Sequence, residues 1–156
     1  MIRDGIHLLS SQPIVITRSH VQIRGESRNN TILQPIVGSV GLIVVKDTEH
    51  VNVKDLTLER TSFYVQNSDF CKIENTVIFN GTIDFAGGPT TGNDGGQELI
   101  DAYCSSNVDH GNVIQHNFVT SFSESNTEEA ETTVTTPLIS FALQHNGIVS
   151  NNQVTG

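Results

Sequence analysis

One short pattern recurs along this sequence. "HVQIRG" at 20–25, "HVNVKDLTL" at 50–58 and "FCKIENTVIF" at 70–79 carry apolar residues at matching positions. Two later stretches match each other in the same way, "GNVIQHNFVTS" at 111–121 and "NGIVSNNQVTG" at 146–156. The offsets correspond to one or two units of about twenty residues plus insertions, which is the signature of a repeat architecture. This repeat constrains the fold more than any other feature.

Each unit contains very short runs rich in β-branched residues, such as Ile14-Val15-Ile16 and Thr31-Ile32-Leu33, separated by Ser, Asn, Gly and Thr. Such a unit cannot bury its apolar face alone, so neighbouring units must stack at about 4.8 Å. In the last unit we expect Ile148 and Val154 to point to the core. Asn151 or Asn152 would turn the corner, since Asn tolerates left-handed backbone. Stacked Asn side chains would hydrogen-bond along the axis, and the sequence therefore predicts an all-β solenoid.

The stretch "PIVITRSHVQIRGESRNNTILQP" at 13–35 resembles the opening rungs of the right-handed parallel β-helix of the pectate-lyase-like superfamily. The spacing of Ile148, Asn151, Asn152 and Val154 is similar to the rung repeat of that superfamily. The resemblance implies a right-handed parallel β-helix of about six to seven rungs. This is the fold of the polysaccharide lyases, glycoside hydrolases and phage tailspikes of that type. It also implies an extracellular, virion or cell-surface location. The alternative fold is an antiparallel sandwich, which would not need one in-strand motif to recur.

The length fits a single domain spanning 1–156. Two stretches do not repeat: a glycine-rich one near 86–107 and an acidic one near 122–137. On a solenoid, insertions leave at the corners and often build the binding face. The last unit stops without a polar cap, which would leave an open strand edge. We therefore expect that this sequence is a piece of a longer chain, or that a neighbouring domain or a second copy covers its end. In either case the last rung should be exposed or in contact with another chain.

The charges are unevenly distributed. All eight Lys and Arg lie between Arg3 and Lys72, whereas residues 81–156 hold nine of the 17 acids and no base. Phosphate binding needs clustered bases, so the sequence argues against nucleic acid as a partner. A polyanionic sugar would be repelled by the second half unless a cation bridged it. No apolar run reaches the roughly 18 residues of a membrane helix, and the N-terminus lacks the apolar core of a secretory signal.

The resemblance implies polysaccharide chemistry on one sheet face. Lyases of this kind abstract a proton beside a uronate carboxylate with a basic group, often while Ca²⁺ neutralises that carboxylate. Hydrolases use two or three carboxylates as acid and base. The catalytic candidates in this sequence are Asp84, Asp101, Asp109, His110 and Arg60.

Each candidate has a competing interpretation. Asp84 lies between two apolar residues, so strand alternation places it outside. Asp109 and His110 belong to "VDHGN", of which only "DHG" matches a motif of polygalacturonase-like enzymes, and the Asp-Asp and Arg-x-Lys motifs are missing. Arg60 follows Glu59 and could form a local ion pair instead. Further bases for a lyase are Lys54, Lys72, Tyr64 and Tyr103, of which the two lysines are interpreted as outer surface charges.

A calcium site is a further hypothesis. Asp94, Glu98 and Asp101 in "GNDGGQELID" supply hard oxygen ligands. The spacing of an EF-hand is absent, and the competing interpretation is a glycine loop with surface acids.

Cys71, His20 and His50 are interpreted as structural residues. Cys71 sits in an apolar strand and is interpreted as a buried free thiol, with a bridge to Cys104 as the alternative. His20 and His50 occupy the same position of two units and are expected to stack at a corner.

Two functions remain open at this point. The first is a carbohydrate-active or carbohydrate-binding β-helix, a lyase or hydrolase if it is catalytic, with an extracellular polysaccharide as the partner. The second is a non-catalytic structural β-helix of a tailspike, adhesin or surface assembly.

Overall fold

A computed structural model describes residues 1–86, 109–120, 139–142 and 144–155. Every regular element in these residues is a β-strand, and every strand pairing is parallel. An all-β fold is thus confirmed, and the antiparallel sandwich is wrong for the described residues. No helix that could cross a membrane occurs in this part of the chain.

Three long sheets and one short sheet contain all the strands of the described residues. Sheet 1 consists, in spatial order, of β1 (Gly5–Leu9), β4 (Thr31–Pro35), β7 (Thr57–Glu59), β10 (Val77–Phe79), β14 (Phe118–Thr120) and β18 (Gln153–Thr155). Sheet 2 consists of β2 (Ile14–Ile16), β5 (Gly41–Lys46), β8 (Thr61–Gln66), β11 (Ile83–Ala86) and β15 (Ile139–Ala142). Sheet 3 consists of β3 (Gln22–Arg24), β6 (Asn52–Lys54), β9 (Lys72–Glu74), β13 (Val113–Gln115) and β17 (Ile148–Ser150). The short sheet pairs β12 (Asp109–His110) with β16 (Gln144–His145).

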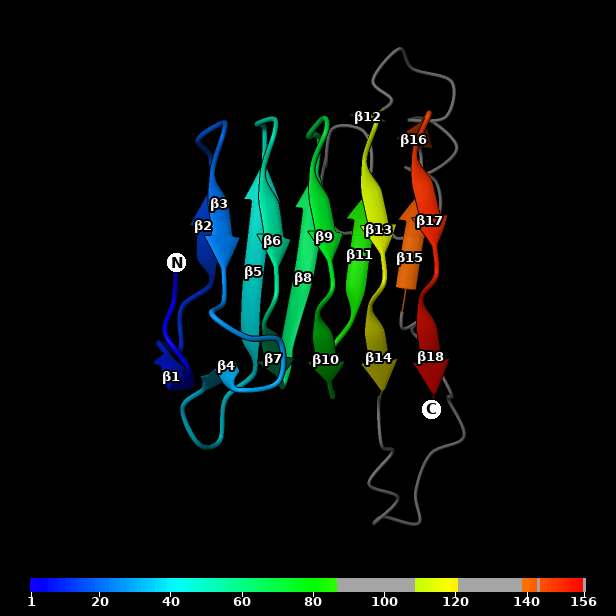
Figure 1. Ribbon diagram of the computed structural model, residues 1–156. Coiled ribbons are helices and arrows are strands. Elements are labelled where there is room, and N and C mark those ends of the chain that lie inside the picture. Colours follow the sequence, from blue (N-terminus) through cyan, green and yellow to red (C-terminus); the bar gives the residue numbers. More distant parts are fainter. Residues whose placement is uncertain (87–108, 121–138, 143, 156) are drawn as a thin grey trace, which may run out of the picture.

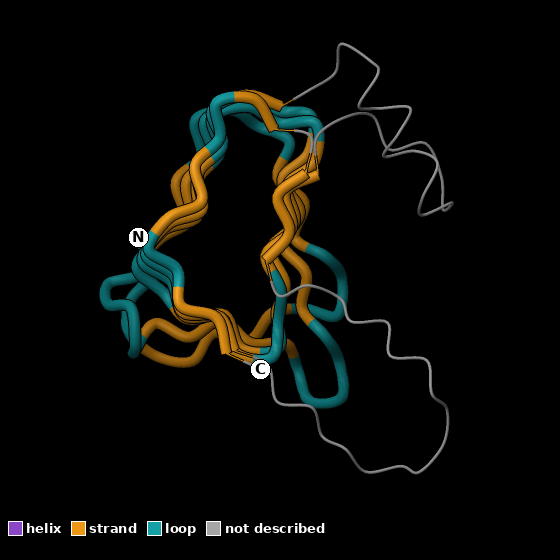
Figure 2. The backbone as a smooth tube through the Cα atoms, turned by 90° about the vertical axis from the view of Figure 1, so that its right-hand side faces the viewer, coloured by secondary structure: helices purple, strands orange, loops and turns teal. Residues whose placement is uncertain are grey.

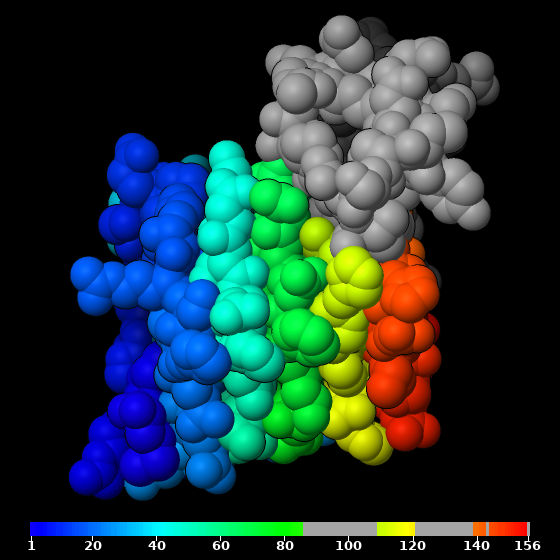
Figure 3. All heavy atoms as spheres, turned by 90° about the horizontal axis from the view of Figure 1, so that it is seen from above, coloured from blue at the N-terminus to red at the C-terminus, as the bar shows by residue number. Residues whose placement is uncertain are grey.

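The chain visits sheet 2, sheet 3 and sheet 1 in that order and then starts again (Figure 1). Viewed along the axis, the three sheets enclose a triangular cross-section (Figure 2). Successive segments lie side by side from blue to red in the space-filling view (Figure 3). This arrangement is compatible with a parallel β-helix. The long sheets contain six, five and five strands in the described residues, so the expected six to seven rungs are not confirmed by these counts.

The predicted alignment of the repeats is the observed register. Ile23 pairs with Val53, which pairs with Ile73. In the later units Ile114 pairs with Val149. All of these lie on sheet 3, because the same position of each unit returns to the same place in the stack.

Inward residues form one continuous apolar core. Its fully buried large side chains are Phe63, Phe85, Ile43, Leu56, Leu58, Ile73, Ile78, Ile83, Ile114, Val45, Val51 and Val53. Phe85 contacts Phe63 and Phe141 across neighbouring strands of sheet 2, with ring centroids 6.0 and 5.7 Å apart. Burying one such side chain stabilises the fold by about 1.5–3 kcal/mol, so these rings contribute strongly to the stack.

One prediction about direction is wrong. Ile148 was expected to point to the core, but it pairs with Val113, on the outer side of sheet 3, and is 50% exposed. Val149 is the inward residue, since it pairs with the buried Ile114. A shift of one position changes the face because side chains alternate along a strand.

The corners are turned by residues in the left-handed region. The corner after sheet 3 uses Asp55, Asn75, His116 and Asn151, with φ between 48° and 56°. The corner before sheet 3 uses His20, His50, Phe70, Gly111 and Asn146, with φ between 52° and 65°. Only Gly adopts this region without cost, and Asn and Asp adopt it more readily than other residues. Asn151 therefore turns its corner, as one of the two predicted alternatives.

Side chains stack along the axis at these corners. The rings of His20 and His50 are 4.9 Å apart and parallel, and Phe70 continues the stack 5.0 Å from His50. The predicted histidine stack is confirmed. Cys71, directly after Phe70, is free and buried, and burial raises the pKa of its thiol to about 11.

The last described strands are half exposed. Val149 and Val154 are each 48% exposed. The loop of 123–137, which would contradict an exposed or partnered last rung if it sealed this end, lies outside the described residues, so that expectation stays a prediction. The predicted insertions near 86–107 and 122–137 lie almost wholly outside the described residues.

Candidate functional site

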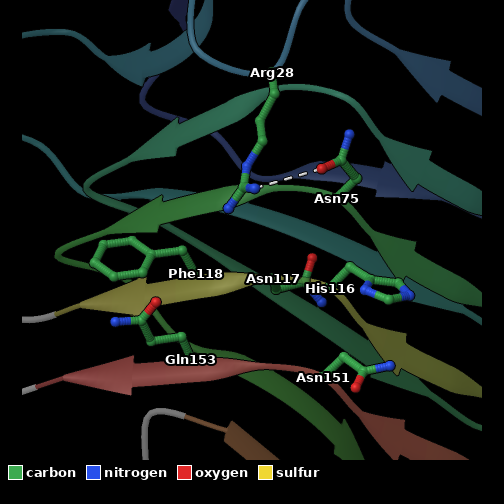
Figure 4. Close-up of a pocket in the computed structure, with 7 residues that line it drawn as sticks. All are labelled: Arg28, Asn75, His116, Asn117, Phe118, Asn151 and Gln153. Carbon is green, nitrogen blue, oxygen red and sulfur yellow. Dashed lines mark hydrogen bonds between the residues drawn. The ribbon is translucent and has the colours of Figure 1, made fainter.

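A depression of about 490 Å³ lies on the outer surface where sheet 3 turns into sheet 1 (Figure 4). It is lined by Arg28, Asn75, His116, Asn117, Phe118, Asn151 and Gln153. Its volume is in the range of small-molecule sites, and the residues that line it are polar except for Phe118.

One wall of the depression is a column of corner residues. Asn75, His116 and Asn151 occupy equivalent positions of three successive units, with φ of 48°, 55° and 54°. They each follow a strand of sheet 3 directly. Neighbouring strands are about 4.8 Å apart, so a ligand lying along the axis could contact all three side chains.

Phe118 and Gln153 lie on the sheet 1 side. They are paired positions of β14 and β18 and point outward, because the next residue of β14, Val119, is fully buried. Phe118 is half-buried, so part of its ring faces the depression beside polar side chains (Figure 4).

Asn117 lies at the base and is held rigidly. Its Oδ1 accepts hydrogen bonds from the N–H (3.1 Å) and hydroxyl (2.7 Å) of Thr76. Its Nδ2 donates to the carbonyl of Ile73 (3.2 Å) and to Oδ1 of Asn152 (3.0 Å). All four hydrogen-bonding positions of this amide are therefore used. The base is preorganised, as a binding site requires.

Arg28 closes one end of the depression from the loop between β3 and β4. Its carbonyl accepts a hydrogen bond from the hydroxyl of Thr57 at 2.8 Å, which anchors the loop on the next unit. Its guanidinium then reaches one unit further, with Nη1 3.5 Å from Oδ1 of Asn75 and Nη2 3.4 Å from the carbonyl of Thr76. Both bonds are long for N–H···O contacts, so they are weak.

The guanidinium is incompletely paired. In the described part of the chain five Lys and Arg form ion pairs with carboxylates, namely Arg3, Arg24, Lys46, Lys54 and Lys72. Arg28 has no carboxylate partner within the described part of the chain. Its buried Nε has no hydrogen-bond partner there either. The nearest acid along the corner column, Asp55, is engaged by Arg24 at 2.9 Å and by Nδ2 of Asn75 at 2.8 Å.

A second polar set lies on the outside of sheet 2. Tyr64, Asp84 and Ser140 are paired positions of β8, β11 and β15. Burial raises the pKa of Asp84, against a hydrogen bond from Ser140 that lowers it. Burial and the nearby Asp84 charge raise the pKa of Tyr64. Asp84 faces outward between buried neighbours, as the sequence predicts.

The other predicted catalytic residues lie on different elements. Arg60 turns the corner after β7, and its guanidinium donates to the carbonyl of Pro35 at 3.4 Å. Asp109 is buried on β12, whereas the next residue, His110, is exposed with Nδ1 3.6 Å from Asp69. Alternation along β12 thus sends Asp109 and His110 to opposite faces.

The remaining predicted residues lie outside the described part of the chain or on its surface. Asp94, Glu98 and Asp101 lie in the segment that the structure does not describe. Within the described residues, no cluster of three or more His, Cys, Asp or Glu side chains could hold a metal ion. Lys54 and Lys72 are paired with Glu74 at 3.7 and 2.7 Å, in line with their interpretation as surface charges.

Sequence reasoning missed the depression. The repeat alignment set 111–121 against 146–156, which places His116 opposite Asn151 and Asn117 opposite Asn152, so part of the wall and the base were within reach. It aligned Asn75 only with earlier units. Arg28 was out of reach, because it belongs to an earlier unit and approaches from a loop.

Comparisons with known proteins give no family assignment. A scan against family models finds no match, and neither the curated proteins nor the solved structures include a significant match.

Proposed function

We propose that this protein is a right-handed parallel β-helix of the pectate-lyase-like type that binds carbohydrate in the depression at the corner between sheets 3 and 1. The fold proposal is supported by the repeated passage of the chain through three parallel sheets, in which Ile23 pairs with Val53 and Val53 with Ile73. It is also supported by the amide pair of Asn117 and Asn152. The proposed setting is extracellular or on a virion or cell surface, with a polysaccharide as the ligand.

The single observation that carries the binding proposal is an aromatic ring set beside several amides. The outward ring of Phe118 lies beside Gln153 in the depression, and the side chains of Asn151 and His116 line its other end (Figure 4). Amide and imidazole groups both donate and accept hydrogen bonds, which matches the hydroxyl groups of a sugar. An aromatic surface supplies the apolar contact for the C–H face of a pyranose ring.

A catalytic function is a second candidate, and Asp84 favours it. A carboxyl group with a raised pKa keeps its proton closer to neutral pH, as a general acid must. Tyr64 is the paired residue on β8. A polysaccharide lyase or hydrolase would therefore use the outside of sheet 2.

The non-catalytic alternative is a structural β-helix of a tailspike, adhesin or surface assembly. It is supported by apolar side chains on strands at both ends of the stack. Ile6 and Leu8 on β1 are 62% and 64% exposed, and Val154 on β18 is 48% exposed.

Calorimetric titration with a panel of oligosaccharides tests the binding proposal. We expect binding by the unmodified protein and a loss of at least about fivefold in Phe118→Ala, since removing an aromatic contact costs at least about 1 kcal/mol. Phe70→Ala is the matched control, because Phe70 is a half-exposed ring at a different corner. Equal binding by Phe118→Ala, or no binding to any saccharide, would contradict the proposal.

A further inference from the structure

We infer that the depression selects a saccharide carrying one anionic group and that Arg28 holds this group without a metal ion. The inference rests on the proposed function and adds the chemical class of the ligand. A carboxylate, a sulfate ester and a phosphate ester share the required chemistry.

The first argument is the charge of the lining. The whole chain has a net charge of −9, yet among the described residues the lining includes one Arg, one His and no acid. A cationic recess on an acidic protein attracts negative groups to this place and away from the remaining surface.

The second argument is the spare hydrogen-bonding capacity of Arg28. A guanidinium carries five N–H donors. Two of them make the long bonds of 3.5 and 3.4 Å to Asn75 and Thr76. The Nε N–H is buried, so the remaining Nη N–H groups are the ones available to a ligand. Since Arg28 has no carboxylate partner among the described residues, an arriving anion would not have to displace one. Arg is also the side chain best suited to bind carboxylate, sulfate or phosphate oxygens in pairs.

The third argument is the placement of the groups. Figure 4 shows the guanidinium of Arg28 between Phe118 and Asn75, with Asn151 and Gln153 on the opposite side of the depression. An anionic group at Arg28 would therefore leave the sugar ring near Phe118. The amides of Asn151 and Gln153 would then be available for its hydroxyl groups.

The lining also argues against a bridging cation. Hard cations such as Ca²⁺ are held mainly by carboxylates with carbonyls and waters, and none of the described residues that line this depression carries a carboxylate. The site therefore differs from the calcium-assisted binding that the family resemblance implied.

Titration calorimetry with matched ligand pairs tests the inference. The pairs are sialyllactose and lactose, a digalacturonate and its methyl ester, and glucose 6-phosphate and glucose. We expect at least one anionic member to bind at least about tenfold more tightly than its neutral counterpart, as expected for a charged hydrogen bond. EDTA should leave this preference unchanged.

Variants locate the effect. Arg28→Gln should remove the preference for the anionic member, whereas Arg28→Lys should keep part of it. Lys46→Gln is the control for loss of one positive charge, since Lys46 pairs with Asp47 away from the depression. Urea unfolding of each variant verifies that it is folded.

The outcomes separate the two proposals. Equal binding of anionic and neutral members would overturn the anion inference and leave carbohydrate binding intact. Loss of binding in EDTA would overturn the metal-free site, and so would an unchanged preference in Arg28→Gln. Failure of every saccharide to bind would contradict the proposed function itself.

Discussion

Oδ1 of Asn152 accepts two hydrogen bonds from Asn117, one from its backbone N–H and one from its Nδ2, each at 3.0 Å. These two residues lie 35 positions apart in equivalent places of successive units. Asn117 makes corresponding contacts with Thr76 one unit earlier. Polar side chains inside the stack thus extend the axial hydrogen bonding of the sheets, as amide ladders do in stacked strands.

Replacing Asn117 should destabilise the fold strongly. Asn117→Ala leaves the backbone N–H and the hydroxyl of the buried Thr76 without their acceptor. Because each buried polar group left unpaired costs about 1–3 kcal/mol, we expect the free energy of unfolding to fall by about 2–4 kcal/mol. Urea denaturation followed by circular dichroism measures this change.

Asn152→Ala is the comparison for that measurement. Asn152 lies in the last described unit and is only half-buried, so its loss should cost less than the loss of Asn117. Equal effects of the two substitutions would contradict a ladder whose buried member carries most of the energy.

Gly111→Ala should also destabilise the protein. Gly111 has φ +65°, and a Cβ built there would lie 2.6 Å from Cδ1 of Phe70. The left-handed backbone alone costs a residue with a Cβ about 1–2 kcal/mol, and displacement of the ring adds to this. Urea denaturation should show that the free energy of unfolding falls by more than the cost of the left-handed backbone alone.

A double-mutant cycle separates the two contributions. In a Phe70→Ala background, Gly111→Ala should cost only the backbone term, because the ring that it meets is gone. Full additivity would show that the contact between Phe70 and Gly111 is not the cause.

The fold was largely predictable because one physical pattern determines it. The alignment of Val53 with Ile73, and of Ile114 with Val149, followed from apolar spacing alone. Ile148 was assigned to the wrong face because it and Val149 are both apolar, so alternation offers no signal within the pair. Only the register with Val113 and Ile114 resolves it.

The candidate site was predictable only in part. His116 and Asn151 align in sequence, but Arg28 enters from two units away through a loop whose path no periodicity encodes. The importance of Arg28 comes from its lack of an acidic partner among the described residues, and this depends on the positions of side chains in space. Asp84 was placed correctly on the outside because its buried neighbours leave it no other face.

Cys71 should be unreactive in the folded protein. Burial raises the pKa of its thiol to about 11, and only the thiolate is an effective nucleophile. In a Cys104→Ser variant, labelling with iodoacetamide at neutral pH should be slow and should accelerate when urea unfolds the chain. Labelling at equal rates in the native and unfolded states would contradict this prediction.

Asp84 should make stability fall as pH rises. Burial raises its pKa in the folded state above the ordinary value of 3.8, so the folded protein binds more protons than the unfolded chain in this range. Stability then decreases as pH increases through and above that value. Asp84→Asn removes this dependence. Relative to the unmodified protein, we expect the variant to gain stability between about pH 3 and pH 7.

Ser140 and Tyr64 provide two checks on the same carboxyl group. The hydrogen bond from Ser140 lowers the pKa of Asp84, so Ser140→Ala should raise it further and steepen the loss of stability. The charge of Asp84 contributes, after burial, to the raised pKa of Tyr64. In a Tyr103→Phe background, Asp84→Asn should therefore shift the ultraviolet titration of Tyr64 to lower pH. An unchanged titration would show that the charge of Asp84 does not reach the phenol of its paired residue.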